Sequence, residues 1–178
     1  PACGSCHDNV NFATGANHAD LPQISNNQCA NCHWPEGEVE FDTSIIGAHT
    51  IPEFSSYLPG VTFDLIRVTN GAAGSTPTVT FSVKDKSGAL IVPSTMSRLA
   101  LVLAGPTVDY ASSLSEDPRK AAQTNGDGTY NYTFQSAIPA GAKGSYGIGI
   151  EGYNNVTLLP GTTKEQSVKV VPTSGLTE

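Results

Sequence analysis

The feature that most restricts how this chain can fold is a short pattern, Cys-x-x-Cys-His, that occurs twice near its start. The copies run from Cys3 to His7 and from Cys29 to His33, and they use all four cysteines of the 178 residues. Residues 1–52 hold both copies, all four histidines and the only tryptophan, but show almost no apolar periodicity. A segment so poor in core-forming residues needs a cofactor, a metal ion or disulfides to organise it.

Three chemistries can explain the repeated pattern. In covalent haem attachment, two cysteines bind the vinyl groups of one porphyrin, and the histidine that follows them coordinates the iron. A zinc ribbon would bring both cysteine pairs onto one ion, although the 22 residues between Cys6 and Cys29 lie just outside the usual gap of about 15 to 20. Two structural disulfides are the third possibility. Only haem uses a histidine after each pair, so the pattern favours two haems attached at Cys3, Cys6, Cys29 and Cys32.

The histidine count supports the haem interpretation. Two haem irons have four axial positions, and His7 and His33, which end the two motifs, would fill the proximal ones. His18 and His49 are the only other histidines, and we predict that they are the distal ligands. The sequence leaves open which of them serves which haem. Irons ligated by two histidines have no open position, so they favour electron transfer at low potential over binding of O₂ or a substrate.

Other side chains near the motifs have less specific roles. Phe12, Trp34 and Phe41 are candidates to line porphyrin faces, and simple burial explains them equally well. Met96 lies far from either motif and just before an expected strand. We therefore expect Met96 to pack in a core rather than to ligate iron.

From residue 53 to residue 178 the pattern changes to short alternating runs separated by Gly and Pro turns. Seven runs predict strands, at residues 61–68, 78–85, 89–92, 98–105, 128–136, 144–153 and 165–171. Residues 108–124 are expected to form a helical turn or a long loop. Seven short strands at this spacing predict an antiparallel β-sandwich of immunoglobulin-like architecture, without the inter-sheet disulfide because no cysteine remains. The whole chain is thus predicted to be mainly β, with a mostly irregular dihaem module at residues 1–52 and the sandwich at residues 53–178.

Composition excludes several classes of function. Acidic residues outnumber basic ones, 16 to 9, and no basic stripe exists, so nucleic acid is not expected as a partner. No run approaches the eighteen or so apolar residues of a membrane span. The β region has neither His nor Cys, and its Ser and Asp residues lie in turn contexts, so we do not expect an enzyme. The chain opens on Pro1 rather than Met, and we interpret it as a mature or excised piece of a longer protein.

The order of these motifs resembles a known family. The segments "CGSCHDNVNFATGANH", "QCANCHWPEG" and "GAHTIP", followed by "PTVTFSVKDKSGALI" and "RLALVLAGPTVDYA", are similar to the outer-membrane decahaem c-type cytochromes of metal-reducing bacteria, the OmcA/MtrC family. The similarity covers nearly the whole chain, and its specific part is the combination of Cys-x-x-Cys-His with "NFATG" and "LAGPTVDYA". The chain has two haem motifs rather than ten, so we interpret it as the end of one haem domain with the β domain that follows.

The resemblance implies two covalent haem c groups, with ligands at the predicted positions. These are Cys3, Cys6, Cys29 and Cys32 for attachment, His7 and His33 as proximal ligands, and His18 and His49 as distal ligands. It also implies an exported protein, at the outer-membrane surface, outside the cell or in the periplasm, that exchanges electrons with other multihaem cytochromes or haem domains, metal oxides or flavins. Terminal metal reduction would belong to the full-length chain. A β-sandwich binding or adhesion module with a zinc- or disulfide-held cap is the alternative from a different class.

Overall fold

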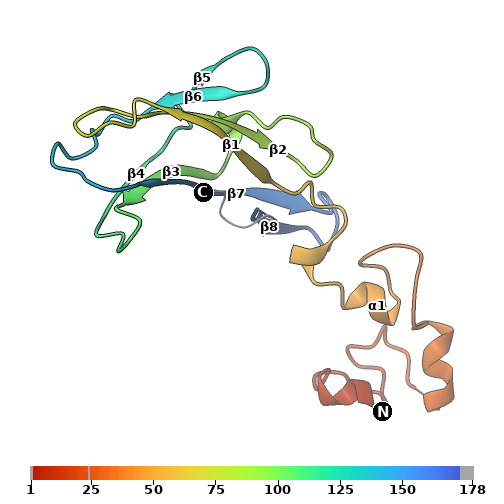
Figure 1. Cartoon of the computed structure of the whole chain (residues 1–178). Coiled ribbons are helices and arrows are strands. Elements are labelled where there is room, and N and C mark those ends of the chain that lie inside the picture. The colour runs from red at the N-terminus through yellow and green to blue at the C-terminus, as the bar shows by residue number, and fades with distance from the viewer. Residues whose placement is uncertain (1, 24, 173–178) are drawn as a thin grey trace. The chain divides into compact units, whose positions relative to one another are not determined.

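The computed structural model of the protein describes residues 2–23 and 25–172. The chain forms two compact units, Pro1–Ser56 and Tyr57–Glu178 (Figure 1). The regular structure of the first unit consists of short helical turns: η1 (Ala2–Ser5), η2 (Asn26–Asn31), α1 (Ile45–Ala48) and η3 (Pro52–Phe54). Within the described residues, no helix has the length and the apolar character needed to cross a membrane.

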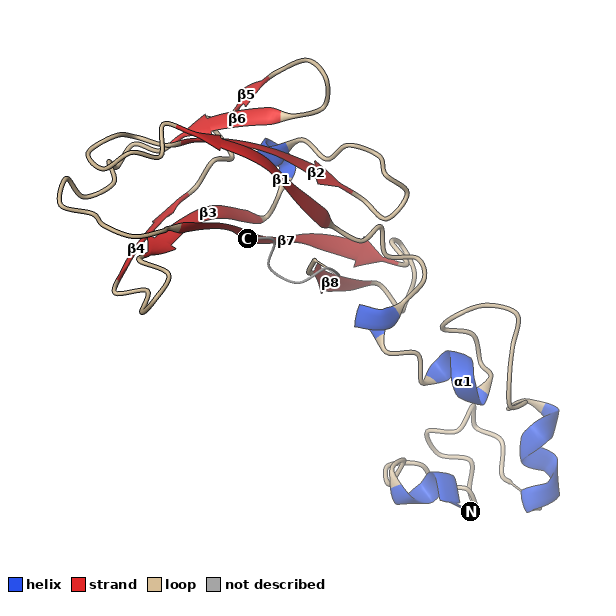
Figure 2. Ribbon diagram, viewed as in Figure 1, coloured by secondary structure: helices blue, strands red, loops and turns tan. Residues whose placement is uncertain are grey.

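The second unit consists of two four-stranded antiparallel sheets (Figure 2). Its strands are β1 (Thr62–Thr69), β2 (Thr78–Lys84), β3 (Arg98–Gly105), β4 (Ser112–Glu116), β5 (Gln123–Thr124), β6 (Tyr130–Thr133), β7 (Gly147–Leu158) and β8 (Gln166–Val170). The sheet orders are β1-β2-β6-β5 and β4-β3-β7-β8. If the strands are lettered A, B, C, C′, D, E, F and G along the chain, these orders read ABED and C′CFG, as in immunoglobulin-like sandwiches. The predicted fold class of this region is therefore confirmed.

The core of the sandwich comes from alternating apolar side chains. In β2, Val79, Phe81 and Val83 have no exposed surface, whereas the intervening positions carry hydroxyl groups on the other face of the sheet. Met96 is also buried, as its predicted packing role requires. Each fully buried side chain of this kind contributes about 1.5–3 kcal/mol to the free energy of unfolding. All buried hydrophobic side chains of the described residues, from Leu58 to Val170, belong to this second unit.

Two segments differ from the predicted strands. Residues 89–92 form no strand, because the Asp85 carboxylate accepts the N–H groups of Ser87 and Ala89 and closes a tight turn. Only an isolated bridge between Lys84 and Leu90 remains there. Conversely, β4 lies in the segment 108–124, where a helical turn or a loop was expected. Its sequence, SSLSE, shows no apolar alternation because β4 is an edge strand with exposed or half-buried side chains.

Glu116, at the end of β4, links one sheet to the other. Its carboxylate accepts the Tyr132 hydroxyl of β6 at 2.8 Å and the N–H groups of Gln135 and Ser136 at 2.8 and 2.9 Å. Burial raises the pKa of Glu116, but these hydrogen bonds outweigh it, and the pKa lies below its ordinary value. Burial, together with the bond to Glu116, raises the pKa of Tyr132 to about 12. The ionised carboxylate of Glu116 therefore connects the β4-β3-β7-β8 sheet to the β1-β2-β6-β5 sheet.

Candidate functional site

The first Cys-x-x-Cys-His motif forms one tight helical turn. The N–H groups of Cys6 and His7 both donate to the carbonyl oxygen of Cys3, at 3.2 and 3.0 Å. Residues four apart in such a turn lie on the same side of the helix. The turn therefore places Cys3 and His7 on the same side of its backbone.

The second motif repeats this turn. The N–H groups of Cys32 and His33 both donate to the carbonyl oxygen of Cys29, at 3.2 and 2.8 Å. The helix η2 begins after Ser25, whose hydroxyl accepts the N–H of Asn27. All four thiols of the chain are free, and three of them are exposed, Cys29 being half-buried. The two motifs thus present the same set of groups in the same local backbone.

The four histidines form two pairs. The ring centroids of His7 and His49 lie 6.1 Å apart, and those of His33 and His18 lie 6.0 Å apart. Each pair joins a motif histidine to one of the two predicted distal ligands. Two imidazoles on opposite sides of one metal ion, with metal–nitrogen distances of about 2 Å, have ring centroids about 6 Å apart. The structure therefore brings His49 to the first motif and His18 to the second, an assignment that the sequence left open.

Three of the four imidazole rings place Nδ1 within hydrogen-bond distance of a backbone carbonyl oxygen. The contacts are His18 with Leu21 at 3.2 Å, His33 with Thr43 at 3.3 Å and His49 with Ile45 at 2.7 Å. Because a carbonyl oxygen can only accept, Nδ1 is the donor in each of these contacts, and Nε2 is the nitrogen on the other side of the ring that a metal could bind. Metal-ligating histidines have this arrangement, with one nitrogen on the metal and the other donating to a carbonyl or a carboxylate.

His18 projects from a tightly folded loop. Its N–H donates to the carbonyl oxygen of Gly15, and its own carbonyl accepts the N–H of Leu21. Gly15 has a φ of +82°, and a Cβ at this position would lie 2.6 Å from the backbone of Leu21, so only glycine fits there. The Phe12 ring lies edge-on to the imidazole, with centroids 5.4 Å apart. Phe12, one of the three aromatic candidates for a porphyrin face, thus contacts a predicted iron ligand.

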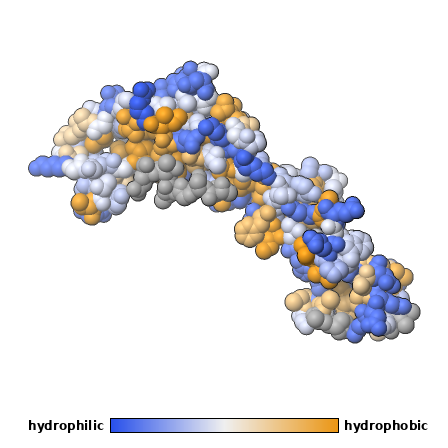
Figure 3. All heavy atoms as spheres, turned by 45° about the vertical axis from the view of Figure 1, so that its right-hand side comes forward, coloured by the Kyte–Doolittle hydropathy of each residue, from blue (hydrophilic) through white to orange (hydrophobic). Residues whose placement is uncertain are grey.

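None of the described apolar side chains of the first unit is buried. Its buried residues are Gly15, Ser44, Gly47 and Ser55 among the positions whose side chains the structure describes. Large apolar side chains are instead exposed: Leu21 (64%), Trp34 (42%), Val39 (57%), Ile45 (48%), Ile46 (60%), Ile51 (54%) and Phe54 (81%). Hydrophobic surface is accordingly open on this unit in Figure 3. Exposed apolar side chains on a unit whose described residues form no apolar core are typical of a surface that contacts a large apolar group.

Three or more His, Cys, Asp or Glu side chains do not come together as a metal-ion site anywhere in residues 2–23 and 25–172. A zinc ribbon needs four thiolates around one ion. The described cysteines do not form such a group, whereas the paired imidazoles supply the two protein ligands that a haem iron takes.

The chain is similar in fold to part of MtrC. The crystal structure of MtrC from Shewanella baltica OS185 matches with a TM-score of 0.58 at 20% sequence identity, over 94% of this chain and 30% of that chain. No protein-family model and no curated protein sequence matches the chain. Because 94% of the chain is covered, the likeness to MtrC includes most of the first unit as well as the sandwich.

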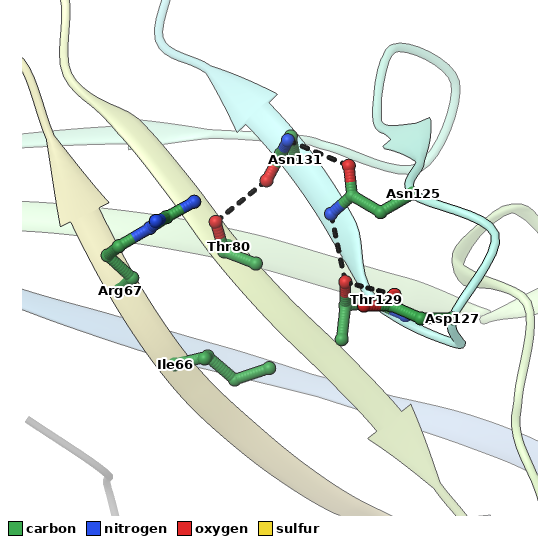
Figure 4. Close-up of a pocket in the computed structure, with 7 residues that line it drawn as sticks. All are labelled: Ile66, Arg67, Thr80, Asn125, Asp127, Thr129 and Asn131. Carbon is green, nitrogen blue, oxygen red and sulfur yellow. Dashed lines mark hydrogen bonds between the residues drawn. The ribbon is translucent and has the colours of Figure 1, made fainter.

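The sandwich also carries a polar hollow of about 420 Å³ on the outer face of the β1-β2-β6-β5 sheet (Figure 4). It is lined by Ile66, Arg67, Thr80, Asn125, Asp127, Thr129 and Asn131. Hydrogen bonds run in one direction from the Thr80 hydroxyl through Asn131, Asn125 and Thr129 to the Asp127 carboxylate. Because these polar groups bind one another, we assign the hollow to the packing of the sheet face rather than to ligand binding.

Proposed function

We propose that the protein transfers electrons through two covalently attached c-type haems, each ligated by two histidines. The observation that carries this proposal is the position of a second imidazole beside each motif histidine, at 6.1 and 6.0 Å between ring centroids. One haem would be held by Cys3, Cys6, His7 and His49, and the other by Cys29, Cys32, His33 and His18.

The surroundings of these ligands fit such a group. A porphyrin is a large apolar body, and the first unit exposes apolar side chains such as Leu21 and Trp34, while none of its described apolar side chains is buried. When bound, a haem with two imidazole ligands supplies a one-electron couple with no open coordination position. The chain's own part is to hold the ligands, to orient the rings and to limit water at the porphyrin edges.

The backbone carbonyls that accept from Nδ1 influence the redox potential. A hydrogen bond from Nδ1 makes the imidazole a stronger donor to the metal, and a stronger donor favours the oxidised iron. His18, His33 and His49 each have such a carbonyl partner. No methionine, the ligand that raises haem potentials, lies near either motif, since Met96 is buried in the sandwich. We therefore propose low potentials for both haems.

The wider role is supported by the fold of MtrC and by the sequence resemblance to the OmcA/MtrC cytochromes. On this basis the chain is a section of an exported, multihaem cytochrome that works at the outer membrane, outside the cell or in the periplasm. It would exchange electrons with neighbouring haem domains or other multihaem cytochromes, and through them with metal oxides or flavins. The sandwich would serve as a spacer or docking element, and the section itself would have no enzymatic activity.

The test is to export the chain in a host that attaches haem c and to measure its intact mass and its absorption spectrum. We expect the mass of two haems, sharp α and β bands on reduction, and no binding of carbon monoxide. Replacing His18 or His49 with alanine should let one iron per chain bind carbon monoxide. A correctly matured chain without haem, and with zinc by elemental analysis, would refute electron transfer and leave the binding or adhesion module.

A further inference from the structure

We propose that Asp42, Thr43 and Ser44 form a clamp, here called the 42–44 clamp, that positions axial ligands of both haems at once. This inference rests on the proposed function, because it concerns the ligands of the same two irons. It assigns a positioning role to a carboxylate and a hydroxyl that belong to neither motif.

The clamp reaches His49 through α1. A four-residue helix is too short to be stable without help at its ends. Ser44 provides that help as the N-cap, its hydroxyl oxygen accepting the N–H of Gly47 at 3.0 Å, and its side chain has no exposed surface. His49 is the C-cap of the same helix, and its Nδ1 donates to the carbonyl oxygen of Ile45. The position of the His49 imidazole therefore depends on the cap at Ser44.

The same clamp reaches the second motif by two routes. The carbonyl oxygen of Thr43 accepts from Nδ1 of His33 at 3.3 Å. In addition, the N–H groups of Ile45 and Ile46 donate to the carbonyl oxygens of Trp34 and Pro35, the two residues that follow His33. The first turn of α1 is thus attached to the end of the second motif. One three-residue segment consequently supports the distal ligand of one haem and accepts a hydrogen bond from the proximal ligand of the other.

Asp42 holds the clamp in shape. Its Oδ1 accepts the N–H and the hydroxyl of Ser44 at 2.9 and 2.5 Å, and its Oδ2 accepts the N–H of Val39 at 3.4 Å. Glycines stand on both sides of the carboxylate, and a Cβ at Gly37 or Gly47 would overlap it. The hydrogen bonds from Ser44 lower the pKa of Asp42, so the carboxylate is ionised over the neutral range. The loss of this one group should therefore affect both haems in different ways.

The proposal predicts an asymmetric result for Asp42→Ala. Without the clamp, α1 loses its cap, His49 leaves the iron of the first motif in part of the molecules, and carbon monoxide binds at up to one haem per chain. The second haem keeps His33 and His18, because His33 is fixed by its own motif turn and His18 by its own loop. It loses only the Thr43 hydrogen bond, so its redox potential should rise while it stays low-spin.

Ser55 offers a matched control for this experiment. Like Ser44, it is a buried serine of the first unit whose hydroxyl donates to a carboxylate, that of Glu40, at 2.5 Å. Ser55 is outside the clamp and outside α1. Ser55→Ala should bind no carbon monoxide, and Ser44→Thr, which keeps the capping hydroxyl, should behave as the parent chain. Ser44→Ala removes the cap itself, so it should open the first haem to carbon monoxide at least as much as Asp42→Ala does.

The measurements are intact mass for haem content, carbon monoxide titration, and a spectroelectrochemical titration that resolves the two potentials. The proposal is supported if Asp42→Ala retains two haems, binds carbon monoxide at one and shifts the potential of the other upward. It is overturned if both haems of Asp42→Ala stay low-spin at unchanged potentials, if both bind carbon monoxide, or if Ser55→Ala has the same effect. A parent chain that lacks two low-spin haems would instead refute the proposed function.

Discussion

A chain that cannot bind haem would test how the first unit is held together. We consider the variant in which all four cysteines are serine. Ordering the backbone costs about 1–2 kcal/mol per residue, and each fully buried apolar side chain returns about 1.5–3 kcal/mol. The second unit contains all the buried hydrophobic side chains of the described residues, and the first contains none. We therefore expect Pro1–Ser56, about a third of the 178 residues, to unfold while the sandwich remains folded.

Amide hydrogen exchange followed by mass spectrometry measures this difference directly. Peptides from the first unit of the variant should exchange as fast as an unfolded chain, whereas peptides from β2, β3 and β7 should keep the protection they have in the haem-loaded parent. The parent chain produced without haem attachment is the matched control, because it keeps the four thiols and should behave like the variant. Slow exchange in the first unit of either haem-free chain would refute the argument that haem provides its core.

Four further predictions concern single side chains. In a chain whose first-motif cysteines are both alanine, His18→Ala should open the remaining haem to carbon monoxide and His49→Ala should not; the reverse result would contradict the pairing seen in the structure. Glu116→Ala should lower the free energy of unfolding of the sandwich by about 2–4 kcal/mol, as measured by urea unfolding. The reason is that hydrogen bonds to a charged group contribute about 1.5–3 kcal/mol each and are not additive. The pKa of Glu116 is lowered on folding, so its contribution to the free energy of unfolding is complete above the pKa of about 4 in the unfolded chain and is lost as the pH falls through the pKa in the folded chain. Glu116→Gln should therefore make the stability of the sandwich less dependent on pH in the acid range. Phe81→Ala should cost the sandwich about 3–5 kcal/mol in the same assay and leave the haem spectrum unchanged.

The sequence predicted the chemistry of each Cys-x-x-Cys-His motif, but it did not predict which of the two remaining histidines lies beside which motif. The Cys-x-x-Cys-His pattern is a property of five consecutive residues, and the structure shows each copy as one hydrogen-bonded turn. Which distal histidine lies beside which motif depends on loops such as the one around Gly15, which has a positive φ. The pattern of apolar residues in a sequence does not predict such a loop conformation. The role of Asp42 was missed for a similar reason. A lone carboxylate in an irregular segment gives no signal, although an Asp two residues before a helix-capping Ser44 is a pattern that could be sought.

The sandwich was predictable where its strands are half-buried. β2 and β3 alternate or run apolar because they lie at the centre of their sheets, between two neighbours. The edge strand β4 has no such pattern, and it was identified only through its pairing with β3, in which Leu103 lies opposite Leu114. The run at residues 89–92 looked like a strand by composition, but Pro93 begins the helix η4 (Pro93–Thr95) directly after it. Apolar composition and alternation therefore predicted the central strands correctly, but they were wrong at the edge strand β4 and at residues 89–92.

The pairing of the histidines gives the first unit a nested connectivity. His18 and His33 are 15 residues apart and lie wholly inside the 42 residues that separate His7 from His49. In the proposed ligation, closing the loop from His7 to His49 costs about 0.9 kcal/mol more in chain entropy than closing the loop from His18 to His33. The His18–His33 pair should therefore form first. Of the four proposed ligands, His49 is the nearest along the chain to residue 57, where the second unit begins. In the proposed ligation, a force that pulls on the backbone from the second unit would therefore act on the His7–His49 pair before the His18–His33 pair. The pair that forms last would be the first to separate.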